Sequence, residues 1–237
     1  MIESVNNEKV KMYSKLNDKK YREEMNLFII EGKHLVEEAI KKGIIKEVFL
    51  LNGEESIYEN TTYVTEEVIK KISSLNTPPK IIAICHKLTN QNIEGNILII
   101  DDISDPGNLG TIIRNAVAFN YQTIIMSPNT VDIYNPKVIR ASEGMLFHIN
   151  LITSDLLDIM PELKKDNYTI YGSSPDNGVE ASKTNNKHAL VIGSEARGIS
   201  KEVLDLCDEN LYIKMNPLCE SLNAGVSSGI LMHELNK

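Results

Sequence analysis

Hydrophobic and polar residues follow two patterns along this chain, and each pattern predicts one kind of element. Short runs that are apolar throughout predict strands of a parallel sheet, because such strands are covered on both faces. Apolar residues spaced three and four positions apart predict helices that bury one face. The two patterns alternate over most of the 237 residues, so we expect an α/β protein.

The first ninety residues form one group of predicted elements. We expect strands at 28–30, 44–51 and 80–85, and helices at 8–25, 33–42 and 65–73. The stretch 88–95 is polar and lacks an apolar period, which is typical of a linker. We therefore divide the chain into a domain over residues 1–88, a linker over 89–95 and a domain over 96–237.

The second domain alternates more regularly. We expect strands at 96–100, 122–126, 168–171, 188–192 and 210–213, with helices at 111–119, 137–146, 154–164, 200–206 and 229–235. This order predicts a parallel sheet with helices on both faces. Three stretches run from a predicted strand through a polar loop to a helix, at 97–116, 189–199 and 211–229. Ligands of such sheets bind beyond the carboxyl ends of the strands, so we expect the three loops to converge.

The third loop contains two residues that can begin a helix. Ser221 and Asn223 flank a leucine just before small residues and an apolar helix, and either can serve as the N-cap. On this stretch alone, a plain cap and a binding site are equally compatible with the residues.

Composition narrows the class of protein. The chain is 42% hydrophobic, which is enough for a sizeable core, and its three cysteines are odd in number and widely separated. We expect a reduced, cytoplasmic protein without a disulfide framework. No apolar run approaches the roughly 20 residues that span a bilayer, and the N-terminus lacks an apolar signal core, so we expect no membrane partner.

Charge is unevenly distributed. The formal net charge is −8, and residues 96–237 carry eleven basic and eighteen acidic side chains. Near the N-terminus, six basic residues stand against the single acid Asp18: Lys9, Lys11, Lys15, Lys19, Lys20 and Arg22. This run is either a solvated helix face or a surface that contacts RNA phosphates.

Several common catalytic motifs are missing from the sequence. It has no phosphate-binding loop of the Gly-x-x-x-x-Gly-Lys type, no Gly-x-Gly-x-x-Gly after a strand, and no Gly-x-Ser-x-Gly elbow. The five histidines are scattered, and no spacing predicts a metal site.

Four stretches together resemble a known family. They are Asp105-Pro106-x-Asn108-x-Gly110-x-x-x-Arg114-x-Ala116, Arg140 to Phe147, Gly193-x-Glu195-x-x-Gly198, and Ile213-x-Met215 followed by Ser221-Leu222-Asn223. In this order they resemble the motifs of the SpoU/TrmH-type RNA ribose 2′-O-methyltransferases of the SPOUT superfamily, over nearly all of 96–237. Residues 8–88 resemble, less specifically, the substrate-binding domain of longer members, which is similar to small RNA-binding ribosomal proteins.

The resemblance implies a fold and a cofactor. In this family, S-adenosylmethionine is bound by a deep trefoil knot near the C-terminus, and the subunits form homodimers around the knot. Carried over to this chain, backbone groups around Gly193, Ile213 and Leu222 hold the cofactor, with Met215 in the same loop. One position departs from the family: Lys214 stands where proline is usual, and the lost restraint on φ is expected to loosen the third loop.

The resemblance also implies site residues. Arg114 is expected to stabilise the developing alkoxide or grip a neighbouring phosphate, because a guanidinium keeps its proton and is a poor base. Asn108 is expected either to position the ribose or to cap the helix that carries Arg114. Glu195 is expected to orient Asn108, Arg114 or a loop backbone, or to form a surface ion pair. Ser221 and Asn223 are expected to line the ribose site, and Arg197 is a weaker candidate for an RNA phosphate contact.

The predicted function is methyl transfer from S-adenosylmethionine to a ribose 2′-hydroxyl of structured RNA, ribosomal RNA in particular, with no role for DNA. The separate N-terminal domain favours ribosomal over transfer RNA. Two alternatives within the resemblance are a transfer-RNA ribose methyltransferase and a noncatalytic RNA-binding protein that kept the fold. A nucleotide-binding α/β enzyme unrelated to RNA is disfavoured by the missing phosphate-loop glycines.

Overall fold

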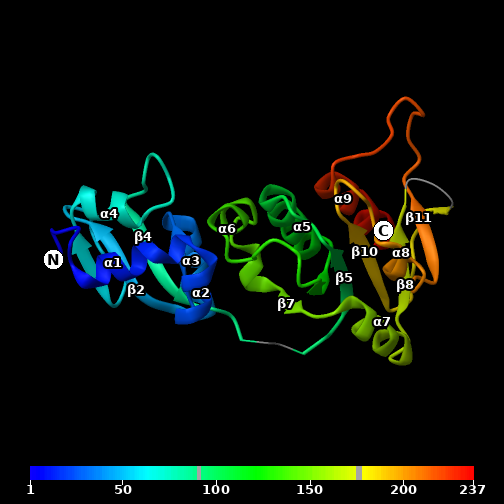
Figure 1. The fold of residues 1–237 in the computed structure, drawn as a ribbon, viewed down its shortest axis with the longest axis horizontal. Coiled ribbons are helices and arrows are strands. Elements are labelled where there is room, and N and C mark those ends of the chain that lie inside the picture. Colours follow the sequence, from blue (N-terminus) through cyan, green and yellow to red (C-terminus); the bar gives the residue numbers. More distant parts are fainter. Residues whose placement is uncertain (90–91, 175–177) are drawn as a thin grey trace. The chain divides into compact units, whose positions relative to one another are not determined.

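The computed structural model describes residues 1–89, 92–174 and 178–237. The chain forms two compact units, and each is described by itself (Figure 1). Unit 1 consists of Met1–Thr89 and Asp132–Phe147, and unit 2 consists of Asn90–Val131 and His148–Lys237. The predicted linker at 89–95 includes residues 90 and 91, which lie outside the described residues. None of the helices within the described ranges is both long and apolar enough to cross a membrane.

Unit 1 is built on a four-stranded sheet with the order β1-β4-β2-β3. β4 runs antiparallel to both of its neighbours, and β2 and β3 are parallel. The N-terminal elements are α1 (Glu8–Ser14), the 3-10 helix η1 (Lys15–Asn17), α2 (Lys19–Met25), β1 (Leu27–Glu31), α3 (Lys33–Lys42), β2 (Ile45–Leu51), β3 (Thr61–Val64), α4 (Glu66–Ile72) and β4 (Ile81–His86). The helix predicted over 8–25 is therefore three short helices, and Asp18 caps the last of them.

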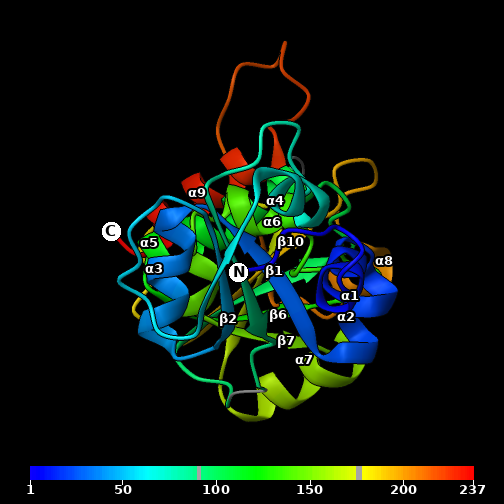
Figure 2. The ribbon, with the colours of Figure 1, turned by 90° about the vertical axis from the view of Figure 1, so that its left-hand side faces the viewer.

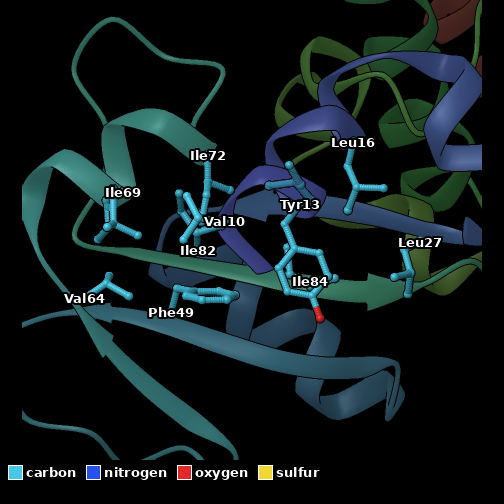
Figure 3. Packing of buried hydrophobic residues seen from close by; sticks show 12 residues of the cluster. Val10, Tyr13, Leu16, Leu27, Phe49, Val64, Ile69, Ile72, Ile82 and Ile84 are labelled. Atoms are coloured by element: carbon cyan, nitrogen blue, oxygen red, sulfur yellow. The ribbon is translucent and has the colours of Figure 1, made fainter. Parts of the chain in front are cut away.

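Helices α1 and α4, together with η1, bury their apolar positions against one face of this sheet. Val10, Tyr13 and Leu16 point toward the strands in Figure 3 and are at most 2% exposed. The ring of Tyr13 meets that of Phe49 edge to face, with 5.7 Å between the centroids. The mostly polar N-terminal helices are thus held by a narrow apolar stripe, which leaves their lysines on the outside.

Residues 132–147, which lie within the predicted catalytic domain, pack in unit 1. They contain α6 (Pro136–Ala141) and lead into the 3-10 helix η2 (Met145–His148). The rings of Tyr134 and Phe147 lie 4.7 and 6.3 Å from that of Phe28 in β1. The predicted helix over 137–146 ends early, because Glu143 and Gly144 have positive φ.

Two arginine contacts join the same segment to the rest of unit 1. The Arg22 guanidinium donates to Asp132 Oδ2 through Nε at 2.9 Å and Nη2 at 2.7 Å. Arg140 donates to Ser74 Oγ at 2.9 Å and lies 3.7 Å from Glu31. The segment is therefore attached by ion pairs as well as by aromatic packing.

Unit 2 is built on a seven-stranded sheet with the order β7-β6-β5-β10-β8-β11-β9, in which every pair is parallel. Its elements are β5 (Asn96–Asp101), α5 (Pro106–Ala118), β6 (Tyr121–Met126), β7 (Asn150–Thr153), α7 (Leu156–Lys165), β8 (Thr169–Ser173), β9 (Val179–Glu180), β10 (His188–Gly193), α8 (Lys201–Leu204), β11 (Glu209–Tyr212) and α9 (Ala224–Leu235). The predicted α/β fold with a parallel sheet is confirmed. The strands β5 and β10 are buried along nearly their whole length, as their apolar runs predict.

The strand order reverses between β5 and β10. Strands β6 and β7 extend the sheet on one side of β5, while β8, β11 and β9 extend it on the far side of β10. Figure 1 labels β7 on the first side and β8 and β11 on the second. The last residues of the two central strands, Asp101 and Gly193, are paired. Loops that leave neighbouring parallel strands in opposite directions open a crevice at this point, and ligands of open α/β sheets bind there.

Candidate functional site

The carboxyl ends of the central strands of unit 2 surround a cavity of about 630 Å³. Its lining comes from four places: the end of β8, the loop after β10, the loop after β11, and the first turns of α9. The lining includes the predicted cofactor residues Gly193, Ile213, Met215 and Leu222. Four further predicted site residues also line it, namely Glu195, Arg197, Ser221 and Asn223. The structure therefore brings the second and third loops together around one hollow.

The first loop reaches this cavity through Asn108. Its Nδ2 donates to Glu195 Oε1 at 2.7 Å, and its Oδ1 accepts from Asn223 Nδ2 at 2.8 Å. Asn223 Oδ1 in turn accepts from the backbone amides of Gly225 and Val226 at 2.9 and 3.3 Å. One row of hydrogen bonds thus joins all three predicted loops.

The chemistry of the donors fixes the orientation of every amide in this row. The Glu195 carboxylate only accepts hydrogen bonds, so the NH₂ group of Asn108 must face it. The carbonyl of Asn108 then faces the NH₂ group of Asn223, and the carbonyl of Asn223 faces the helix amides. Reversing either amide would bring two donors or two acceptors together, so the row holds one arrangement.

Local sequence explains where Asn108 lies. Asp105 is the N-cap of α5, and its carboxylate accepts from the Asn108 backbone amide at 2.7 Å, while Pro106 takes the first helical position. The helix predicted to begin at residue 111 therefore begins at Pro106. Asn108 lies in its first turn rather than in the loop before it, and its side chain is not the cap.

The loop after β10 is a tight turn that requires glycine. Ser194 and Gly198 exchange backbone hydrogen bonds at 3.0 and 2.9 Å. A Cβ on Gly193 would lie 2.2 Å from backbone atoms of Gly198 and Ile199, a distance that no real contact tolerates. Gly198 has φ +67°, in the left-handed region that favours glycine. The close approach therefore requires glycine at 193, and the backbone conformation favours glycine at 198.

The loop between β11 and α9 projects from the rest of unit 2 (Figures 1 and 2). A turn at its tip is closed by Cys219 N, which donates to Asn216 O at 2.9 Å, and Leu218 on this turn is 93% exposed. Lys214, which replaces the usual proline, is exposed. The predicted helix at 229–235 begins at Ala224, because Asn223 caps it; of the two candidate caps, Asn223 is the one used.

Arg114 does not line the cavity. It lies on α5 with an exposed side chain, and within the described parts of the chain it makes no hydrogen bond or ion pair. Its neighbour Asn115 donates from Nδ2 to the backbone oxygen of Gly225 at 2.8 Å, which ties α5 to the start of α9. The structure thus places Arg114 beside the helix that borders the cavity, with its guanidinium directed to solvent.

The five predicted RNA-contacting lysines of unit 1 fall into three groups. Lys9 pairs with Glu47 at 3.0 Å, while Lys19 and Lys20 are exposed and lie 3.9 Å from glutamates one turn further along. Lys11 and Lys15 are exposed, and Lys15 lies over the ring of Tyr21.

Arg22 requires a correction. Its side chain is 3% exposed and its guanidinium is bound by Asp132 and by the Leu16 carbonyl at 2.7 Å. This arginine is therefore structural, and the prediction that it contacts RNA is wrong.

Sequence reasoning missed the wall that β8 contributes to the cavity. Ser173 and Ser174 follow the buried part of that strand and line the hollow, as do Ser227 and Leu231 of α9. The strand order explains the omission, since β8 lies between β10 and β11 and its carboxyl end must open into the same crevice. A sheet order was not available from the sequence alone.

The lining suits a nucleoside-like cofactor. Ile192, Leu211, Ile213 and Leu231 offer apolar surface for a planar ring, and serine hydroxyls with loop backbone groups offer polar contacts. The volume lies within the usual range for small-molecule sites, about 300–1,000 Å³. Within the described residues, no group of three or more His, Cys, Asp or Glu is placed to hold a metal ion.

Comparison with known proteins gives consistent matches to one family. Residues 95–233 match the SpoU rRNA Methylase family, and residues 7–83 match the MRM3-like substrate binding domain. The chain is 36% identical over 244 residues to the 23S rRNA (guanosine(2553)-2′-O)-methyltransferase RlmP of Bacillus subtilis, covering 99% of this chain and 98% of that protein.

Two solved structures share the fold. The crystal structure of an RNA 2′-O ribose methyltransferase superimposes with a TM-score of 0.85 at 26% identity, covering 98% of this chain and 96% of the other. The SpoU methyltransferase AviRb from Streptomyces viridochromogenes, in complex with the cofactor AdoMet, gives 0.86 at 20% identity, with 97% of each chain covered.

Proposed function

Because this chain belongs to the SpoU rRNA methylase family, we propose that it transfers a methyl group from S-adenosylmethionine to a ribose 2′-hydroxyl of ribosomal RNA. The observation that carries the proposal is the cavity at the strand ends of unit 2, which the Asn108–Glu195–Asn223 row borders. The relative from Bacillus subtilis is named for this reaction on a guanosine of 23S rRNA.

The cavity is the proposed cofactor site. Backbone groups around Gly193, Ile213 and Leu222 would hold the adenosine, and Met215 would close the same wall. When bound, the sulfonium of the cofactor supplies an electrophilic methyl group. The chain must then place a ribose hydroxyl in line with that methyl group and keep water away, which orientation and apolar walls accomplish.

The Asn108–Glu195–Asn223 row is the proposed orienting device for the acceptor ribose. Asn108 is fixed at both ends of its amide, so its position relative to the cavity does not depend on solvent. Ser221 makes no hydrogen bond with its hydroxyl among the described residues and is available to a ligand. A prearranged row of this kind costs no reorganisation when substrate binds.

Arg114 is the proposed electrostatic clamp, acting across a homodimer. Its guanidinium is exposed and is not part of the cavity lining of its own subunit, so we assign it to the reaction centre of a second copy. The apolar residues of α9 are spread around the helix, and Val226 remains 51% exposed, which suits burial against another subunit. The clamp would stabilise the developing alkoxide or hold an adjacent phosphate.

We assign RNA capture to residues 1–88 and catalysis to residues 96–237. The lysines of unit 1 that remain exposed would contact phosphates, and the match to a substrate-binding domain favours this division. DNA is excluded as an acceptor because it lacks the 2′-hydroxyl. We also propose that the C-terminal segment forms the trefoil knot that the resemblance implies, and that the protein acts in the cytoplasm.

The test is methyl transfer with isotopically labelled S-adenosylmethionine. Ribosomal RNA and transfer RNA from cells that lack this protein are offered separately, and the label is mapped by resistance of the linkage to alkali. We expect label on a ribose of ribosomal RNA, and none when that position carries a 2′-deoxy sugar. Label on bases alone would overturn the ribose assignment, and label on transfer RNA alone would overturn the substrate.

A further inference from the structure

Asp102 has an unusual backbone conformation at the point where the sheet order reverses. It directly follows β5, the central strand that pairs with β10, and it has φ +59°. A residue with a Cβ in the left-handed region costs about 1–2 kcal/mol, and aspartate is one of the few that adopts it. Strain of this kind persists only where the surroundings fix it, and it concentrates at functional sites.

Ser127 at the end of β6 fixes this conformation. Its hydroxyl accepts from the Asp102 backbone amide at 2.9 Å and donates to Asp102 Oδ1 at 2.7 Å. The Thr130 hydroxyl lies 2.9 Å from the same oxygen of Ser127, and both hydroxyl-bearing residues are less than 9% exposed. The backbone and one carboxylate oxygen of Asp102 are therefore held by buried groups, while the other oxygen accepts a long hydrogen bond of 3.5 Å from Asn129 Nδ2.

That second oxygen faces Arg197 in the loop after β10. Arg197 Nη2 lies 3.4 Å from Asp102 Oδ2, and the arginine side chain is 78% exposed. The backbone amide of Arg197 donates to Ser194 Oγ at 3.2 Å, so the tight turn fixes where the side chain starts. The direction in which the guanidinium points then depends on Asp102.

We propose that Asp102 is a positioning residue that directs Arg197 toward an RNA phosphate next to the target ribose. This inference rests on the proposed function. Arg197 is the only arginine or lysine among the described residues that line the cavity, in a part of the chain where acids outnumber bases. Its single long contact leaves most of its five N–H donors available, and a planar guanidinium binds phosphate through two of them at once.

The ion pair with Arg197 adds little to stability. An exposed ion pair contributes about 0–1 kcal/mol, which does not exceed the cost of the backbone conformation. The loop after β10 is already attached to β5 by the preceding residue, because buried Asp101 accepts from the Ser200 backbone amide at 2.7 Å. Asp101 therefore docks the loop, and Asp102 acts on a side chain of that loop.

The test compares Asp102→Asn, Arg197→Ala and the double variant with the wild type. Asparagine also adopts the left-handed conformation and can accept from Ser127, but it lacks the charge that attracts Arg197. The KM for RNA, kcat, and the salt dependence of RNA binding are measured on the full chain, with the Kd for S-adenosylmethionine as the measure of an intact cavity. Asp166→Asn, an exposed carboxylate at the end of α7, is the matched control for loss of one negative charge.

We expect Asp102→Asn to raise the KM for RNA about fivefold to tenfold, as loss of roughly one charged contact does. The slope of log K against log salt should become shallower by about 0.7–0.9, the value for one phosphate. The cofactor Kd should not change, and the double variant should match Arg197→Ala. Because removing an acid otherwise favours RNA binding, the control should bind RNA as well as the wild type or better.

Three results would overturn the inference. An unchanged KM for RNA and an unchanged salt dependence of RNA binding in Asp102→Asn would show that Asp102 does not position Arg197. Tighter RNA binding in that variant would show that Asp102 competes with RNA for the arginine. Additive effects in the double variant would show that the two residues act separately. A wild-type chain that methylates no RNA would overturn the proposed function itself, whatever the variants do.

Discussion

The ion pair between Arg22 and Asp132 gives the sharpest prediction for stability. Arg22 is 3% exposed and Asp132 12%, and their shortest contact is 2.7 Å. In Asp132→Ala the guanidinium would stay buried and keep only its bond to the Leu16 carbonyl. Breaking a buried pair by removing one partner costs about 3–5 kcal/mol, because the remaining charge is uncompensated. We expect unit 1 to lose that much of its free energy of unfolding.

The measurement is urea unfolding of the full chain, followed by a signal from unit 1. Glu23→Ala is the matched control, since its pairing with Lys19 is exposed and 3.9 Å long, and it should change stability by less than about 0.5 kcal/mol. The double change Arg22→Met and Asp132→Leu removes both charges and should recover most of the loss.

A loss below about 1 kcal/mol in Asp132→Ala would refute the reasoning, because water or another group would then be solvating the guanidinium. A double variant as unstable as the single one would also refute it. In that case the cost would come from lost side-chain packing, or from the lost hydrogen bond of the Tyr134 backbone amide to Asp132, rather than from an unpaired charge.

The remaining predictions concern the site and pH. Gly193→Ala should weaken S-adenosylmethionine binding at least about tenfold by calorimetry, because its Cβ would meet backbone at 2.2 Å. Gly198→Ala, which meets no atom within 4 Å but has φ +67°, should have a milder effect. Arg114→Lys keeps the charge and loses the planar fork, so most methyl transfer should be lost with cofactor binding intact; near-normal turnover would show that a point charge is enough. His188 is buried, and burial lowers its pKa below the ordinary value of about 6.5, so the unfolded chain takes up the proton first. Stability should therefore fall as pH drops below about 6.5, and a pH series of urea midpoints should flatten in His188→Gln if this histidine is responsible.

The sequence predicted the strands of the sheets best where they are buried on both faces. The apolar runs at β5 and β10 could be recognised because nothing but a covered strand or core helix accommodates them. β3 and β7 were not predicted, since each is a four-residue strand at a sheet edge with polar residues among its apolar ones. Short edge strands form because they pair with a neighbouring strand. The pattern of residues within the strand carries no information about that neighbour.

The candidate site was also predicted only in part. Eight of the residues that line the cavity could be named, because each follows a strand that the sequence reveals and strand ends meet at one edge. The contact between Asn108 and Glu195 was among the expected ones, and the structure has it. The burial of Arg22 could not be foreseen, because its partner lies 110 positions away in the sequence. Local pattern carries no signal for an ion pair of that range.

The two-part composition of unit 1 has a consequence for exchanging pieces between relatives. A chimaera joined near residue 89 would receive a foreign N-terminal segment while keeping its own Asp132, Tyr134 and Phe147. Those side chains would pack against a foreign segment whose sequence did not evolve together with them. Successful recombination should require both stretches to travel together, and across many genomes the identities at positions 22 and 132 should change in step.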